Sequence, residues 1–133
     1  MIDDVEKALT QVLLESDLLA ELVGDRVFPQ VLPQFCDYPA IAYTVVDAVP
    51  INTLDGNAGL ESVRVQFDVW ASSYSDKAAV SREIRRALLA YETGGTVAGF
   101  NIGAVLLETQ RDEPYEHETK SFRTILDFMI WHN

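Results

Sequence analysis

The sequence predicts an α+β fold: a mixed, mostly antiparallel sheet with two helices packed on one face, in the order α-β-β-β-α-β-β. Three observations predict it. Two segments repeat apolar residues every three or four positions, several others alternate apolar and polar residues, and the connections between the alternating segments suit hairpins. The 133 residues, 48% of them hydrophobic, suffice for one domain, which we expect to span residues 1–133.

Both predicted helices carry one apolar stripe. Asp3 followed by Glu6 resembles a capping box at the start of the first helix. Its stripe consists of Val5, Ala8, Leu9, Val12 and Leu13. Ser16 is placed to cap a further short helical turn, which Gly24 closes. The second helix is predicted over residues 75–91. Its stripe consists of Val80, Ile84, Ala87, Leu88 and Tyr91.

The strands are predicted from runs of β-branched and aromatic residues. They cover residues 26–28, 40–49, 60–71, 100–109 and 120–132. Prolines predict a loop over residues 31–39, and Asp-Gly predicts a hairpin turn within residues 54–59. Residues 110–119 are rich in charge and predict a second, exposed loop.

Period-two alternation assigns the strand residues to two faces of the sheet. One face, expected under the helices, carries Val63, Val65, Phe67, Val69 and Phe128. The opposite face carries Trp70, Trp131, Met129 and Ile125, interleaved with Arg64, Asp68, Arg123 and Asp127, and Tyr43 and Val45 are further candidates for it. Aromatic residues, Met and Arg are enriched at protein interfaces, so this face predicts a subunit contact. A sheet bent enough to bury some of these residues internally is the alternative.

Charge is distributed unevenly. The net charge of −11 argues against nucleic-acid binding, which depends on a basic surface. Arg82, Arg85 and Arg86 nevertheless form a basic ridge on the second helix, while acidic residues gather in the late loop. Such polarity suits head-to-tail contacts that close into rings, and a solvated ridge paired locally with Glu83 is the alternative. The loop residues proposed to make contacts are Asp55, Asn57, Arg111, Asp112, Glu113 and Glu116.

No motif predicts a catalytic, cofactor or metal site. Phosphate-binding loops, nucleophile elbows and paired-cysteine spacings are absent from the sequence. Cys36 has no histidine near it in sequence, and the Glu116-His117-Glu118 run reads as an exposed loop. Asp68 and Asp127 are candidates for a carboxylate pair, but the neighbouring arginines favour cross-strand ion pairs instead. We therefore expect no enzymatic activity.

The location is also indicated by composition. The single cysteine suits a reducing interior, and the acidic start of the chain is unlike a signal peptide. No apolar run approaches the roughly 20 residues that a membrane helix needs. We expect an intracellular protein without membrane contact.

Several segments, taken in order, resemble the tail-completion family of long-tailed bacteriophages, also called tail-terminator or head–tail joining proteins. The segments are Gly-Asp-Arg-Val-Phe-Pro at 24–29, Leu-Pro-Gln at 32–34, Tyr-Pro-Ala-Ile-Ala-Tyr at 38–43, Val-Gln-Phe-Asp-Val-Trp-Ala at 65–71, the helix with Ile84, Arg85, Ala87 and Leu88, and Asp-Phe-Met-Ile-Trp-His at 127–132. They span nearly the whole chain.

The resemblance implies a non-enzymatic subunit that forms a ring, a hexamer in the particle that can be a monomer in solution. Its partners would be the major tail tube protein and the head–tail connector, with DNA passing through the ring. It would assemble in the host cytoplasm and end in the virion tail of a phage, a prophage or a gene-transfer particle. A small-molecule-binding or regulatory α+β domain is the alternative function, since fold alone does not assign one. An enzyme with dispersed carboxylates is a third hypothesis.

Overall fold

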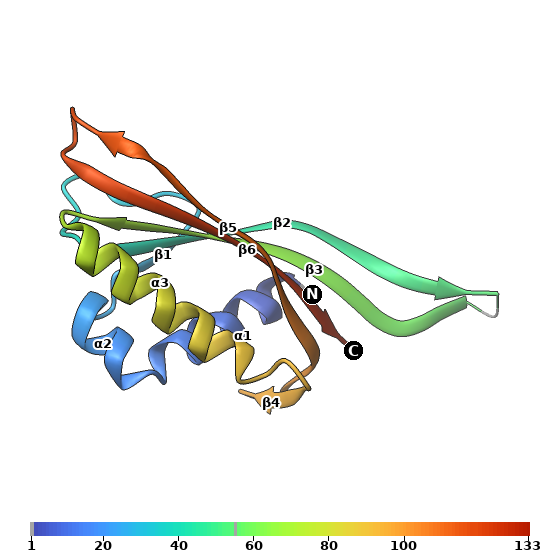
Figure 1. Ribbon diagram of the computed structural model, residues 1–133. Coiled ribbons are helices and arrows are strands. Elements are labelled where there is room, and N and C mark those ends of the chain that lie inside the picture. The colour runs from blue at the N-terminus through green and yellow to red at the C-terminus, as the bar shows by residue number, and fades with distance from the viewer. Residues whose placement is uncertain (1, 55) are drawn as a thin grey trace.

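The computed structural model describes residues 2–54 and 56–133, which form three helices and one curled six-stranded sheet (Figure 1). The strand order across the sheet is β1-β2-β3-β6-β5-β4. β1 is parallel to β2 and every other pairing is antiparallel, as the predicted mixed sheet requires. The order along the chain, α-α-β-β-β-α-β-β-β, has one helix and one strand more than predicted.

The additional helix is α2 (Asp17–Val23), which follows α1 (Ile2–Leu14). The signals that indicated only a capped turn define a complete short helix. The Ser16 hydroxyl accepts a hydrogen bond from the Leu19 amide at 3.3 Å, and the Gly24 amide donates to the Ala20 carbonyl. α2 packs against α1 and α3 (Tyr74–Leu89), whose N-cap is Ser73. No helix among the described residues is long and apolar enough to cross a membrane.

β1 (Val27–Pro29) is short, whereas β2 (Ala40–Thr53) and β3 (Gly56–Ala71) form a long hairpin. β2 continues past Pro50, where the prediction ended it, because a proline is tolerated on a strand that has an open edge. The pairing of β3 with β6 begins at Glu61. Residues 51–54 and 56–60 therefore project beyond the sheet as a two-stranded arm, here called the β2–β3 arm, which extends away from the helices in Figure 1.

The second half of the chain adds β4 (Gly95–Val97), β5 (Phe100–Glu116) and β6 (Ser121–His132). The loop predicted over residues 110–119 is wrong, because β5 runs to Glu116 and pairs with β6 as far as Ser121. Two of the charged residues that suggested a loop have partners across the strands, since Arg111 lies near Asp127 and Asp112 accepts from Thr124, both on β6. An exposed edge strand also carries charge without penalty.

The core lies between the helices and one face of the sheet. Val63, Val65, Phe67 and Val69 are completely buried there, which confirms the predicted alternation. The rings of Phe67 and Phe128 meet edge to face with centroids 5.7 Å apart. Tyr43 and Val45 belong to this face and not to the opposite one, because β2 pairs them with Phe67 and Val65. The sequence did not reveal the phase of β2 relative to β3, so this assignment was wrong.

Candidate interaction surfaces

The face of the sheet opposite the helices, here called the second face, is crossed by ion pairs between neighbouring strands. Arg123 bonds Asp68 at 2.9 Å and stacks over the Trp70 ring with its guanidinium carbon 4.7 Å from the centroid. Asp127 accepts a hydrogen bond from Thr109 at 3.0 Å and lies 3.5 Å from a nitrogen of Arg111. Each carboxylate thus has its own polar or cationic partner. The predicted cross-strand ion pairs are confirmed, although Arg64 takes Glu108 of β5 as its partner.

Apolar side chains share this face with the ion pairs. Trp70, Met129 and Trp131 are partly exposed, whereas Ile125 is 3% exposed and belongs to the interior of the curled sheet. Ile125 and Asp68, which is 9% exposed, are thus buried, as the bending alternative expects of some residues on this face. The other three apolar side chains remain available for contact with a partner.

The basic ridge of α3 is exposed and lies beside β5. Arg86 is 3.6 Å from the carboxylate of Glu83, so the predicted local pairing holds for one of the three arginines. Together with Leu89 and Leu107, the three arginines line a hollow of 280 Å³ between α3 and β5. A basic surface thus borders the edge of the sheet.

Lys77 of α3 does not belong to the ridge, because its side chain is only 5% exposed and its ammonium lies 3.1 Å from Asp112. The Thr124 hydroxyl donates to the same carboxylate oxygen of Asp112 at 2.7 Å. This hydrogen bond, helped by the Lys77 charge, lowers the pKa of Asp112 below its ordinary value. Asp112, proposed from the sequence as a loop contact, thus joins α3 to β5 and β6 inside the subunit.

The other loop candidates are distributed differently from the prediction. Asp55 lies outside the described residues, and Asn57 is placed on β3 by its backbone alone. Arg111, Glu113 and Glu116 stand on β5, where Arg111 lies 3.5 Å from Glu113 and Glu116 accepts from the Glu118 amide. They are strand residues at one end of the sheet.

The exposed edges of β2 and β5 and the length of the β2–β3 arm were missed by the sequence reasoning. Leu54 at the tip of the arm is fully exposed, and Val49 on β2 and Leu106 on β5 are each 52% exposed. The run of β-branched residues on both sides of Pro50 was the signal that could have revealed the long hairpin.

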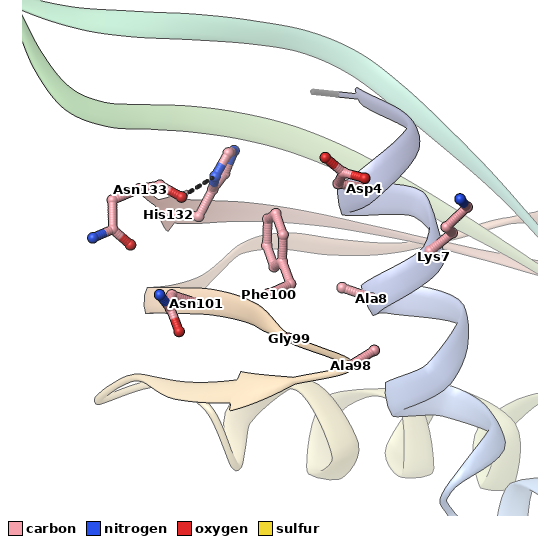
Figure 2. A pocket seen from close by; sticks show the side chains of 9 residues that line it. All are labelled: Asp4, Lys7, Ala8, Ala98, Gly99, Phe100, Asn101, His132 and Asn133. Carbon is pink, nitrogen blue, oxygen red and sulfur yellow. Dashed lines mark hydrogen bonds between the residues drawn. The ribbon is translucent and has the colours of Figure 1, made fainter.

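A hollow at the base of the arm lies between the start of α1 and the end of β6, with Asp4 and Lys7 on one side and His132 on the other (Figure 2). His132 is 5% exposed. Its Nε2 is 3.1 Å from Glu61, and its ring centroid lies 4.6 Å from that of Phe100. The imidazole thus contacts the first residue of β3 that pairs with β6, and it also contacts β5. These contacts lie next to the base of the arm.

The residues considered as a catalytic nucleophile or as metal ligands do not form a common site. Cys36 donates to the Asp37 carbonyl at 3.3 Å, and burial raises the pKa of its thiol, which disfavours the reactive thiolate. His117 contacts the Tyr115 ring, with centroids 5.0 Å apart. Within the described ranges, no three His, Cys, Asp or Glu residues come together in a way that could hold a metal ion.

A sheet with open edges, a projecting arm, a basic ridge and a second face of ion pairs and tryptophans offers surfaces of the kind that proteins use to contact one another. The chain matches the family described as tail completion protein gp17 over residues 7–133, and it belongs to that family. It is therefore a structural tail protein of bacteriophage type, and the family implies a non-catalytic role.

A solved structure shares the fold. One chain of the virion of a native gene transfer agent particle superposes with a TM-score of 0.78 at 15% sequence identity, covering 96% of this chain and 93% of that chain. No curated protein matches the sequence.

Proposed function

We propose that this protein completes the phage tail by forming a ring, a hexamer, on the end of the tail tube. The ring stops further polymerisation of the tube and joins the finished tail to the head, and DNA passes through its centre. The whole of residues 1–133 acts as one domain of each subunit. The protein carries out no catalysis.

The match to the tail-completion family over residues 7–133 is the observation that carries this proposal. The fold shared with a chain of a gene transfer agent virion supports it, because that particle also resembles a phage. The separation of the basic ridge on α3 from acidic surfaces elsewhere suits head-to-tail contacts, which generate closed rings. Trp70, Met129, Trp131, Arg64 and Arg123 supply the second face with groups that favour interfaces.

The partners follow from the position in the particle. The subunit meets the major tail tube protein on one side of the ring and the head–tail connector on the other. It assembles in the host cytoplasm and remains in the virion tail. It binds no nucleic acid specifically and no membrane.

Deletion of the gene from the phage or prophage tests the function. We expect filled heads and separate tails, many of them overlong, because tube polymerisation has no stop. Electron microscopy of purified lysates measures the separation of heads from tails and the lengths of the tails. Complementation with the intact gene should restore whole particles. Normal infectious particles from the deletion strain would refute the proposal.

A further inference from the structure

The sheet has two largely open edges. β1 pairs with β2 only at Ile41–Tyr43, and β4 pairs with β5 only at Phe100–Ile102. In the part of the chain that the structure describes, no other strand pairs with the outer edges of β2 and β5. The unpaired backbone groups of such an edge are a template for another strand.

The directions of these two edges are complementary. β2 is antiparallel to β3, β3 to β6, and β6 to β5, so β2 and β5 run in opposite directions. A second copy that simply continues the sheet would therefore place its β2 antiparallel to β5 of the first. Such a contact joins two different surfaces and repeats from copy to copy, which is the geometry that closes into a ring.

The two edges also present matching apolar residues. The β5 segment of residues 104–107 is Ala-Val-Leu-Leu, and Leu106 lies on the second face because it pairs with Met129. On β2, Val49 pairs with Ser62 and so lies on the same face, next to Arg64 along β3. Val49 and Leu106 are each 52% exposed. A continued sheet would set these side chains against each other and remove both from water.

Neighbouring features confine the contact to these stretches. Beyond Leu107 the pairing of β5 with β6 shifts register, and charged residues follow. Beyond Val49 comes Pro50, which has no backbone N–H to donate. Bulges, charges and prolines all oppose strand addition, and β2 itself shifts register between Val45 and Asp47, so Ala48 and Val49 of β2 and Leu106 and Leu107 of β5 are the usable parts.

We propose that the sheet of one subunit continues into the next, with Ala48 and Val49 of β2 in one copy paired antiparallel to Leu107 and Leu106 of β5 in the neighbour, so that Val49 is set against Leu106. The partner is thus a second copy of this chain. The inference rests on the proposed ring and adds the pairing that joins its subunits.

Disulfide trapping in assembled tails tests this pairing. Opposed residues of antiparallel strands have Cα atoms about 4.5–5.5 Å apart, within the range that a disulfide spans. In a Cys36→Ser background, the double variant Val49→Cys/Leu106→Cys should give a ladder of covalent multimers on oxidation, with loss of the monomer band. A mixture of the two single variants should give dimers and no longer species, because each subunit then carries one cysteine.

The matched control is Val31→Cys/Leu106→Cys, since Val31 is 74% exposed but lies outside β2. This variant should stay monomeric on a non-reducing gel, and thermal unfolding followed by circular dichroism should show that all variants fold. A ladder from the control as well, or a monomer from the Val49→Cys/Leu106→Cys variant in tails of normal length, would overturn the strand pairing. The second result would leave the tail-completion function standing, which the deletion experiment decides separately.

Discussion

At the scale of single residues, the contact of Lys77 with Asp112 shows how a charge is stabilised inside this small protein. A buried ammonium is costly unless a carboxylate and further hydrogen bonds accompany it. Asp112 meets this need on β5, and Thr124 of β6 donates to the same carboxylate oxygen. One carboxylate therefore holds three elements together.

Replacing this carboxylate should make stability depend less on pH. The lowered pKa of Asp112 means that the folded protein favours its charged form more than the unfolded chain does. The resulting stabilisation is present above the ordinary pKa of 3.8 and is lost as the pH falls through the lower pKa of the folded state. Asp112→Asn should therefore be less stable than the wild type at neutral pH, and the difference should shrink in acid.

Urea unfolding at a series of pH values measures this difference. The Asp37→Asn variant, which alters another exposed acid, serves as the control and should follow the wild type more closely. A difference between Asp112→Asn and the wild type that stays constant down to low pH would contradict the assignment.

At the scale of elements, α3 combines two functions on different sides. Its buried side contributes Val80, Ile84 and Leu88 to the core, while its exposed side carries the three arginines beside β5. Among the described residues, the ion pair that these arginines make is that of Arg86 with Glu83, within α3 itself. The arginines are therefore open to substitution without loss of the fold.

Charge reversal on this ridge should weaken assembly. Arg82→Glu/Arg85→Glu should reduce ring formation in tails, because it removes the attraction to an acidic surface of the neighbour, and should leave the unfolding temperature nearly unchanged. Lys7→Glu/Lys120→Glu changes the net charge equally at two exposed positions elsewhere and is the control. Light scattering of purified tail ends or complementation of the deletion strain measures the effect. If both variants formed rings, or complemented the deletion strain, to the same extent, the ridge would not be part of the interface between subunits.

At the scale of the whole molecule, the net charge of −11 coexists with a local basic ridge. Subunits that meet through the ridge would direct part of the remaining acidic surface toward the ring centre. DNA would pass such a lining without adhering, because like charges repel.

An acidic lining, together with the net charge of −11, would predict that the protein has no measurable affinity for duplex DNA at physiological salt. Fluorescence anisotropy with a labelled duplex tests the free subunit, and a solved ring tests the lining itself. A lumen lined by basic residues would contradict this expectation. Tight binding of DNA by the subunit would do the same.

Local sequence signals determined the helical stripes, the caps at Ser16 and Gly24, and the alternation that buries Phe67 and Phe128. These features depend on residues close together in the chain, so periodicity and capping chemistry reveal them. The family resemblance also came from ordered local segments, and the family match over residues 7–133 confirmed it.

Only the tertiary structure decided which residues face each other across strands. It moved Tyr43 into the core, extended β5 through a stretch that resembled a loop, and paired Asp112 with a lysine 35 positions earlier in the chain, at 3.1 Å. It also left β2 and β5 with open edges that run in opposite directions. Strand register and edge exposure arise from contacts between segments distant in sequence, which no local pattern encodes.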